Sequence, residues 1–416
     1  MGGCRTIGGS SVLVRSNNES VLVDYGIYMS GAPHFPLPCN PREISAIILT
    51  HSHLDHSGAM PLLYVSGNTE LYATQMTLEL AELLLTDEIN LSGELLPFEE
   101  NELARMLNRS HPVKVGDEAT PNGNIHLKFT DAGHIPGSIS TIIETEGKRV
   151  LVTGDINTIE SGLLEGAKID LSDMDAVVIE GTYALQDHPK RKDTEREFVD
   201  SVREVLEESQ GKVLIPAFAV ARSQEILCVL EKYGVNYPVT IDGMVRAASK
   251  IILSNPDFVK DYSLLRRALD RATWVRDRRD KEKALSNPGI IVASAGMLDG
   301  GAAVNYLNAL SQDSKNGIFL VSFQIPGTTG RSLIETGTYI SNNGEKRKAR
   351  SEVKFFDFSS HCGRSELWGI LEGLNSSAKV YVVHGEEEAC TSLAERIRTE
   401  LRIEAIAPSN GDSYEL

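Results

Sequence analysis

The chain has 416 residues, a length that suits about two domains. Its 58 acidic and 41 basic side chains leave a net charge of −17, so overall charge argues against nucleic-acid binding, which would need a locally basic surface. The five cysteines are scattered without a CxxC pair, no apolar run reaches the roughly 20 residues of a membrane helix, and no signal-peptide core follows Met1, so we expect a cytoplasmic protein that binds no membrane.

The first part of the chain alternates short strands with two helices. Period-two patterning and buried apolar runs predict strands at residues 11–16, 19–26, 44–50, 124–133, 138–147, 148–155 and 175–183. The first two strands are expected to form a hairpin across a turn at 17–18. Apolar residues at helical spacing predict helices at 74–90 and 99–110.

A different rhythm follows a polar, charged link at residues 185–196. Strands and helices then alternate along the chain, with strands at 212–218, 238–242, 289–296 and 317–324 and helices at 195–209 and 222–234. This alternation indicates a parallel sheet covered by helices. Near the end of the chain, we expect short units at 353–361 and 378–386, a helix between them at 364–374, and a last helix at 390–401.

The loop that leaves the strand at 44–50 carries the sequence HSHLDH, residues 51–56. His51 and His53 can turn toward one cation while Asp55 and His56 turn toward another, because imidazole and carboxylate both suit zinc. The alternative is a polar turn before a helix that begins near Ser57. Four such side chains in six positions favour the metal site, but this loop cannot close one alone.

Further ligands follow other predicted strands. His134 and Asp155 both stand at the carboxyl ends of strands, where loops gather functional residues. Each of them alone is more typical of a turn; together with the HSHLDH loop, they would supply a third imidazole and a carboxylate able to bridge two metals. Asp24 also ends a strand, and we expect it to orient a metal-bound histidine through the other ring nitrogen.

The order of Asp24, the HSHLDH loop, His134 and Asp155 resembles the metallo-β-lactamase superfamily of di-metal hydrolases. The later segments VIEGTY with Glu180, FSSHCGR with His361 and VVHGEEEA with His384 resemble the three further motifs of the β-CASP nucleases, in the same order. The resemblance implies an α/β fold, namely a metallo-β-lactamase αββα sandwich with an inserted β-CASP domain of mainly parallel sheet. We expect residues 1–183 and 351–416 to form the sandwich and residues 184–350 the insertion.

The resemblance also implies a role for each site residue. It assigns His51, His53 and His134 to one Zn²⁺, Asp55, His56 and His384 to a second Zn²⁺, and Asp155 to both. Asp55 is expected to be a catalytic residue as well as a metal ligand. His361 would be the general acid that protonates the leaving oxygen, and Glu180 would hold it. The chemistry agrees: two metals can activate a shared water and hold a phosphoryl oxygen, and a histidine beside a carboxylate suits proton donation near neutral pH.

The implied activity is zinc-dependent cleavage of RNA phosphodiester bonds, as an endonuclease, a 5′–3′ exonuclease or both. The resemblance favours RNA because the branch with a histidine at the position of His384 is associated with RNA cleavage. It also implies a minimal core enzyme whose start is shortened, since related chains usually carry a strand before the glycine loop. We expect a homodimer and association with other RNA-processing or decay factors.

Several residues are candidates for RNA contact. Arg222, near a predicted helix start, and Ser360 are expected to touch the substrate. Two stretches, 264–283 and 345–354, carry eight basic against four acidic and five basic against two acidic side chains, and Trp274 in the first could stack on a base. A solvated helix face of mixed charge is the alternative. Two other functions stay open: a small-molecule ester or thioester hydrolase of the same superfamily, and a non-catalytic scaffold subunit of an RNA-processing complex.

Overall fold

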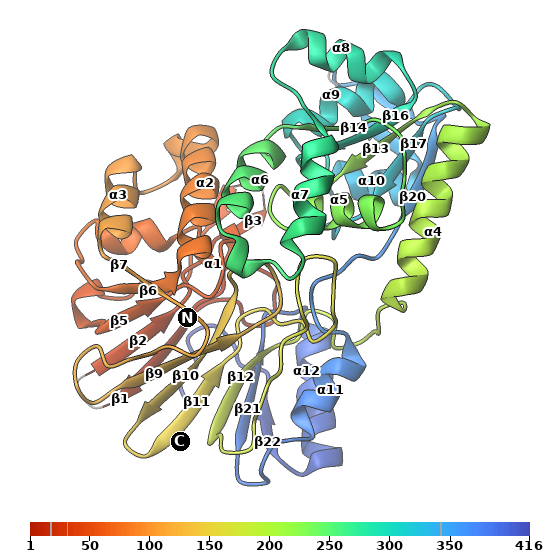
Figure 1. The fold of residues 1–416 in the computed structure, drawn as a ribbon. Coiled ribbons are helices and arrows are strands. Elements are labelled where there is room, and N and C mark those ends of the chain that lie inside the picture. The colour runs from red at the N-terminus through yellow and green to blue at the C-terminus, as the bar shows by residue number, and fades with distance from the viewer. Residues whose placement is uncertain (17–18, 31, 342) are drawn as a thin grey trace. The chain divides into compact units, whose positions relative to one another are not determined.

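The structure is a computed structural model that describes residues 1–16, 19–30, 32–341 and 343–416 (Figure 1). Its internal contacts divide the chain into two units. Unit 1 consists of residues 1–160, 165–187 and 360–416, and unit 2 consists of residues 161–164 and 188–359. Among the helices of the described residues, none combines the length and the apolar character that crossing a membrane requires.

The first sheet of unit 1 contains five strands in the order β1-β2-β5-β6-β7. Their bounds are Val12–Ser16, Glu19–Val23, Ala46–Ile48, Leu71–Thr74 and Ser110–Val113. β1 and β2 are the expected antiparallel hairpin, although its turn at 17–18 lies outside the described residues, and β2, β5, β6 and β7 run parallel. A small hairpin of β3 (Tyr28–Ser30) and β4 (Ala32–His34) follows β2.

The second sheet of unit 1 contains seven strands in the order β22-β21-β12-β11-β10-β9-β8. Their bounds, in the same order, are Glu404–Ile406, Lys379–Val383, Ala176–Glu180, Lys148–Val152, Ile139–Thr145, His126–Asp131 and Glu118–Ala119. β10 is antiparallel to both β9 and β11, and β11, β12 and β21 are parallel to one another. The carboxyl ends of β9, β11, β12 and β21 therefore meet at one edge of the sheet.

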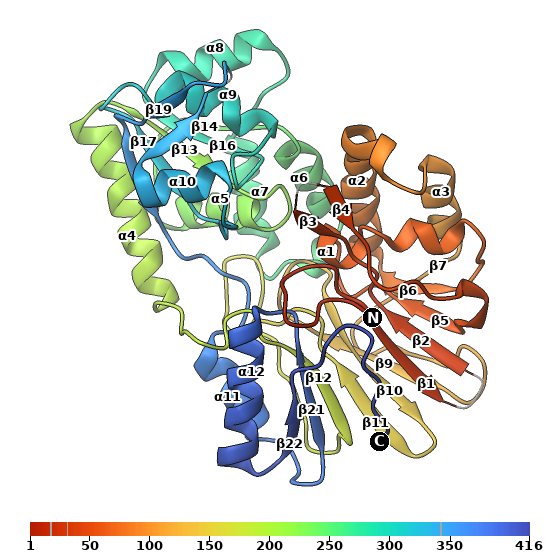
Figure 2. The same ribbon diagram turned by 180° about the vertical axis from the view of Figure 1, so that it is seen from behind.

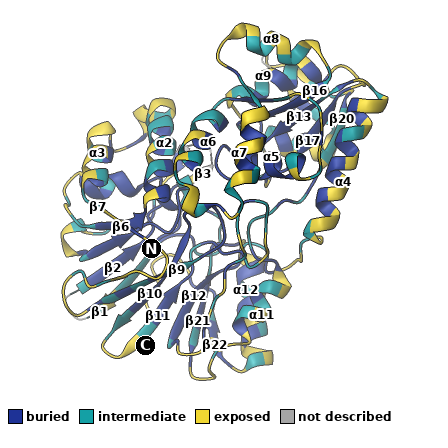
Figure 3. Ribbon diagram, viewed as in Figure 1, coloured by how far each residue is buried: buried dark blue, intermediate teal, exposed yellow. Residues whose placement is uncertain are grey.

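Unit 1 has four layers. Apolar side chains of β2 and β5 pack against those of β9 to β12 and form the core between the two sheets. Helices α2 (Gln75–Ser92) and α3 (Glu100–Asn108) cover the outer face of the first sheet, and α11 (Arg364–Leu371) and α12 (Glu387–Arg396) cover that of the second. Figure 3 shows the strands buried and the outer helix faces exposed. This arrangement is the expected αββα sandwich.

Unit 2 is built on a six-stranded parallel sheet in the order β15-β14-β16-β13-β17-β20. The strands are Thr273–Trp274, Val239–Asp242, Gly289–Ala293, Lys212–Pro216, Gly317–Leu320 and Glu352–Phe355. The helices are α4 (Arg191–Arg203), α5 (Arg222–Lys232), α6 (Val245–Ser254), α7 (Tyr262–Arg271), α8 (Arg278–Ser286), α9 (Gly301–Leu310) and α10 (Thr329–Thr336), several of which Figure 2 shows from behind. The expected inserted domain of mainly parallel sheet is therefore present.

Two local features of unit 2 differ from the sequence-based expectation. β20 pairs with β17, so a boundary between residues 350 and 351 would separate β20 from its own sheet; the contacts place the crossing after Ser359. α4 begins at Arg191, inside the stretch 185–196 that was expected to be a polar link. Its first turns are part of the packed structure, since Thr194 and Glu195 are buried there. Strand partners and buried polar contacts are set by tertiary packing, which local patterning does not report.

A buried carboxylate holds part of unit 2 together. Glu225, on the first turn of α5, accepts hydrogen bonds from the backbone N–H groups of Gly162 (2.9 Å) and Leu163 (3.0 Å) and pairs with Arg191. Burial raises the pKa of Glu225, but the charge of Arg191 and the N–H of Gly162 outweigh it, so that pKa lies below its ordinary value. Glu225 thus anchors the segment 161–164 as an ionised group.

Glu225→Gln should lower the free energy of unfolding by about 3–5 kcal/mol at neutral pH, because it removes the negative partner of a buried ion pair and replaces an acceptor by an amide donor. Urea denaturation followed by circular dichroism would measure this. Glu197→Gln is the matched control, because Glu197 is exposed on α4, and its unfolding free energy should stay within about 0.5 kcal/mol of the wild type. A similar change in both variants would contradict an anchoring role.

Candidate metal centre and active site

The HSHLDH loop is held in place by backbone contacts. Residues 51–53 follow β5, and His53 is the residue before the short helix α1 (Leu54–Ser57). The Asp55 carbonyl oxygen accepts a hydrogen bond from the N–H of Ser10 at 2.8 Å. A Cβ at Gly26 would lie 1.7 Å from that same oxygen, so only glycine allows the chain after β2 to pass this close. The loop is therefore fixed before any ligand binds.

Three histidines come together as the sequence predicts. The ligating nitrogens of His51, His53 and His134 all lie within 4.8 Å of one another, and His53 Nδ1 is 3.3 Å from His134 Nε2. Burial is the main cause that holds the pKa of His51 and of His134 well below the ordinary value and lowers the pKa of His53 to about 4. These imidazoles are neutral at physiological pH, which is the form that binds a metal.

A second group contains Asp55, His56, Asp155 and His384. His384 Nε2 lies 3.2 Å from Asp55 Oδ2 and 3.3 Å from His56 Nε2. His384 follows β21, and its φ of 48° is rare for a residue with a side chain. Its backbone N–H donates to the Gly3 carbonyl oxygen at 2.7 Å, so the glycine loop at the start of the chain helps to hold it.

Asp155 lies between the two groups. Its Oδ2 is 3.5 Å from His51 Nε2 and 3.7 Å from His134 Nε2, whereas its Oδ1 is 3.3 Å from His56 Nε2 and 3.2 Å from His384 Nδ1. Burial raises the pKa of the Asp155 carboxyl, but the imidazoles of His384 and His56 outweigh it and keep that pKa well below its ordinary value. One ionised carboxylate therefore presents a separate oxygen to each group.

The donor set fits metal ions. Two buried atoms, His51 Nε2 and Asp155 Oδ1, have no hydrogen-bond partner among the described residues, an unusual state for buried polar atoms. Both point into the cluster, where imidazole nitrogens and carboxylate oxygens gather. Such a concentration of lone pairs favours divalent cations that accept both nitrogen and oxygen ligands.

Two further contacts orient the imidazoles. Asp24 accepts hydrogen bonds from Thr50 N and Oγ1, both at 2.8 Å, and from His56 Nδ1 at 2.7 Å, which leaves His56 Nε2 facing the cluster. His134 Nδ1 donates to the carbonyl oxygen of Ser360 at 2.9 Å, which leaves its Nε2 facing the cluster. Contacts of this kind set the tautomer and direction of metal-binding histidines. The structure thus places Ser360 in this orienting role through its backbone.

His361 and Glu180 form a pair at the edge of the cluster. Glu180 is the last residue of β12 and is almost fully buried, and its two oxygens lie 3.0 and 2.9 Å from His361 Nδ1. Burial lowers the pKa of His361, but the charges of Glu180 and Asp155 outweigh it and raise that pKa to about 9. The side chain of His361 is 20% exposed, so it can reach a substrate. His361, His134 and Asp155 also lie close enough together to hold a metal ion. The Nδ1 of His361 is already engaged by Glu180, however.

The sequence-based candidates outside this cluster lie in unit 2. Arg222 is the first residue of α5. Trp274 is half-buried in β15, and its indole N–H donates to the Leu269 carbonyl oxygen at 3.0 Å, which restricts stacking on a base. Around it, Arg276 pairs with Asp280 and Arg278 with Glu282. The stretch 264–283 therefore has the mixed-charge character that was the alternative to an RNA-binding surface.

Three polar residues of the site escaped sequence reasoning. Thr50 joins Asp24 to His51, since its Oγ1 lies 2.8 Å from Asp24 Oδ2 and 3.1 Å from His51 Nδ1. Thr182 Oγ1 donates to the His384 carbonyl oxygen at 2.9 Å, and Ser10 Oγ lies 3.3 Å from His56 Nε2. The sequence signal for Thr50 and Thr182 is their position beside predicted site residues: Thr50 directly precedes the HSHLDH loop, and Thr182 lies two residues after Glu180.

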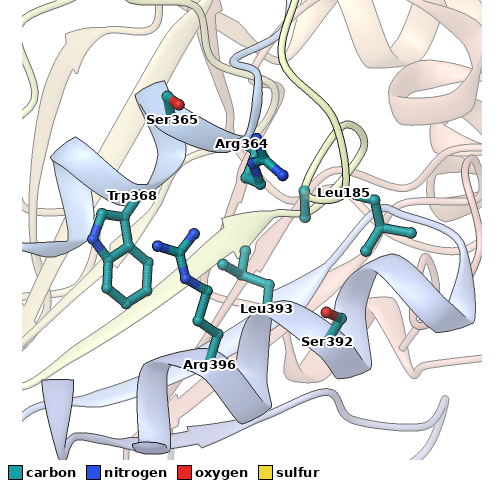
Figure 4. Close-up of a pocket in the computed structure, with 8 residues that line it drawn as sticks. Leu185, Arg364, Ser365, Trp368, Ser392, Leu393 and Arg396 are labelled. Atoms are coloured by element: carbon teal, nitrogen blue, oxygen red, sulfur yellow. The ribbon is translucent and has the colours of Figure 1, made fainter. Parts of the chain in front are cut away.

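Unit 1 also has a hollow of about 480 Å³ at α11 and α12 (Figure 4). It is lined by Ala184, Leu185, Arg364, Ser365, Trp368, Ser392, Leu393 and Arg396. The guanidinium carbon of Arg396 lies 3.8 Å from the centre of the Trp368 ring, and Arg396 also pairs with Glu400, while Arg364 pairs with Asp187. Its two basic groups are therefore neutralised by neighbours, and no predicted site residue lines it.

Three family models match the chain. The metallo-beta-lactamase superfamily matches residues 5–203, the Beta-Casp domain matches residues 223–333, and the Zn-dependent metallo-hydrolase RNA specificity domain matches residues 346–408. Among solved structures, a protein of unknown function from Enterococcus faecalis covers 99% of this chain and 97% of its own with a TM-score of 0.60 and 14% identity. That likeness concerns the fold alone.

Curated relatives match over the whole chain. RNase aCSPSF2 of Saccharolobus solfataricus is 40% identical over 100% of this chain and 84% of its own length. Probable RNase MJ4 of Methanocaldococcus jannaschii is 31% identical over 100% of this chain and 99% of its own. The transcription termination factor FttA of Lokiarchaeum sp. is 34% identical over 99% of this chain and 70% of its own.

Proposed function

Since the chain belongs to the β-CASP ribonucleases of the metallo-β-lactamase superfamily, we propose that it hydrolyses RNA phosphodiester bonds with two zinc ions held by the cluster of unit 1. Metal-dependent ribonuclease activity in RNA processing is the activity of this family. One observation carries the proposal to this chain: Asp155 presents one oxygen to each of two groups of imidazole and carboxylate ligands. A site for a single metal would not need this arrangement.

The proposed ligands follow the two groups. His51, His53 and His134 would hold one zinc ion, Asp55, His56 and His384 the other, and Asp155 both. When bound, two such ions lower the pKa of a water molecule and stabilise negative charge on a phosphoryl group. Burial holds the pKa of His51 and of His134 well below the ordinary value, so these two imidazoles stay neutral and available to a metal at physiological pH.

The chain itself supplies the proton for the leaving oxygen. Because Glu180 accepts from His361 Nδ1, the Nε2–H of His361 is the group that can donate to the departing 3′-oxygen of the RNA. Glu180 also stabilises the protonated imidazole, so His361 can act as an acid above neutral pH. Asp24 and the Ser360 carbonyl group keep two ligand imidazoles in one orientation.

Asp24→Asn should weaken zinc binding by about 10- to 100-fold, because the single amide oxygen cannot accept from both His56 Nδ1 and the Thr50 backbone N–H, which the two Asp24 oxygens do. Competition with a chromogenic chelator would measure the affinity. Activity should fall at limiting zinc and recover when zinc is added in excess. Asp117→Asn, at an exposed turn, is the control and should bind zinc like the wild type. Wild-type zinc affinity of Asp24→Asn would contradict this role.

The two other functions are not favoured. A small-molecule ester or thioester hydrolase would not account for the match to an RNA specificity domain or for relatives that are named RNases. A non-catalytic scaffold would have no use for the complete ligand set or for the His361 and Glu180 pair. The expected homodimer, the association with other RNA-processing or decay factors and the cytoplasmic location stay predictions, which light scattering and co-purification would check.

Incubation of the purified protein with 5′-labelled RNA tests the proposal. We expect cleavage that a chelator stops and added zinc restores, and elemental analysis should find two zinc ions per chain. The product ladder separates internal cuts from stepwise trimming of the 5′ end. RNA that stays intact in the presence of zinc would overturn the activity, and fewer than two zinc ions in an active preparation would overturn the two-metal site.

A further inference from the structure

A two-stranded ribbon of unit 2 carries a row of basic side chains. β18 (Thr338–Ile340) and β19 (Lys346–Lys348) pair antiparallel, with Ile340 opposite Lys346 and Thr338 opposite Lys348; Figure 2 labels β19. From residue 346 to 350 the chain alternates between exposed and partly buried positions, and Lys346, Lys348 and Arg350 are the exposed ones. Since alternate residues of a strand share a face, Lys346 and Lys348 point the same way, and Arg350 continues the row of exposed basic positions two residues after β19 ends.

The two faces of the ribbon differ in charge. On the inner face, Tyr339 is buried and Arg347 pairs with Glu345 at 2.6 Å. Among the described residues, no carboxylate lies within ion-pair distance of Lys346, Lys348 or Arg350. Most other basic side chains in the two basic stretches, such as Arg276 and Lys354, are paired with acids. An unneutralised row of cations is notable in a chain of net charge −17.

Hydroxyl groups extend this face. Thr338 Oγ1 lies 2.6 Å from Thr336 Oγ1 and 3.3 Å from Ser332 Oγ, so three hydroxyls cluster beside Lys348 at the end of α10. Hydroxyl and ammonium groups are both common partners of nucleic-acid phosphates. Ile340 is 54% exposed next to Lys346, where it can cover a ribose or a base.

We infer that this ribbon face binds the backbone of single-stranded RNA. Cations two residues apart on a strand are spaced by about 6.6 Å, so they can meet successive phosphates of one extended strand. The positive charge of this face attracts a polyanion such as RNA, whereas the rest of the protein, which is acidic, repels one. RNA is therefore expected to bind at this face. The inference rests on the proposed function in that RNA is the substrate, but it concerns side chains that are not part of the metal cluster.

Equilibrium binding tests this inference separately from catalysis. Fluorescence anisotropy with labelled single-stranded RNA would be recorded over a range of salt concentrations in the zinc-loaded His361→Ala protein, in which cleavage is suppressed. The test variant adds Lys346→Gln and Lys348→Gln to this His361→Ala protein. The control variant adds Lys192→Gln and Lys250→Gln to it instead. The control lysines are exposed on α4 and α6, and their loss changes net charge equally.

Loss of two phosphate contacts should make the slope of log affinity against log salt shallower by about 1.4 and weaken binding roughly 20-fold near 0.1 M salt. The control should change neither quantity, and arginine at both ribbon positions should retain binding. Equal slopes and affinities in the ribbon and control variants would overturn the inference. Absence of RNA cleavage by the wild type would instead count against the proposed function, since anisotropy still reports whether the ribbon binds.

Discussion

Asp155→Ala is expected to lower ribonuclease activity by at least about 10³-fold and to reduce the metal content below two ions per chain. Asp155 faces both groups of ligands, through Oδ2 toward His51 and through Oδ1 toward His56. Alanine removes one carboxylate oxygen from each group, so the three histidines of the first group keep no carboxylate and the second group keeps only Asp55. It also removes the negative charge that offsets the repulsion between two proposed cations close together. Elemental analysis and a labelled-RNA assay would measure both effects.

The control for this variant is Asp173→Ala. Asp173 is an exposed carboxylate that precedes β12 at the opposite end of the second sheet, so its loss changes net charge equally without touching the cluster. Metal content and activity should equal those of the wild type. Thermal unfolding of both variants in chelator would show whether the fold is intact. Wild-type metal content and rate in Asp155→Ala would refute a bridging role.

His361→Ala should lower kcat by about 10²- to 10⁴-fold while the metal content stays unchanged, because it removes a proton donor and no proposed ligand. The loss should be much smaller for a phosphodiester with a p-nitrophenolate leaving group, which departs without being protonated. A comparison of kcat on RNA and on this ester separates a general acid from a ligand. Equal losses on both substrates, or loss of metal, would contradict the assignment of His361 as the acid.

The pH profile provides a second reading of the same pair. Glu180 and Asp155 raise the pKa of His361 to about 9, so the acid form persists through neutral pH and is lost only in alkaline solution. Glu180→Gln removes one of these charges and should lower that pKa, which moves the alkaline decline of kcat to lower pH. His126→Ala, which breaks an exposed histidine–carboxylate pair with Glu118, is the control and should leave the profile unchanged.

Much of the site could be predicted because its ligands stand in recognisable local settings. The spacing of HSHLDH and the positions of His134 and Asp155 after apolar strands are properties of short segments, and the structure brings these residues within a few ångströms. The later motifs around Glu180, His361 and His384 required the family resemblance, because a lone histidine or glutamate carries no local signal of its function.

The sequence by itself indicated the type of most long elements and the chemistry of the cluster, but it missed short strands such as β6 and β7. Apolar periodicity depends only on neighbours along the chain, and so does the choice of imidazole and carboxylate side chains. The tertiary structure alone decided that β20 joins the sheet of unit 2, that Glu225 anchors residues 161–164, and that Asp24 faces His56. It also decided that Lys346 and Lys348 lie on one face of a ribbon with no ion-pair partner among the described residues, whereas cations near Trp274 meet carboxylates. The physical reason is that pairing of strands and charges depends on distances between segments far apart in the chain, which local composition does not contain.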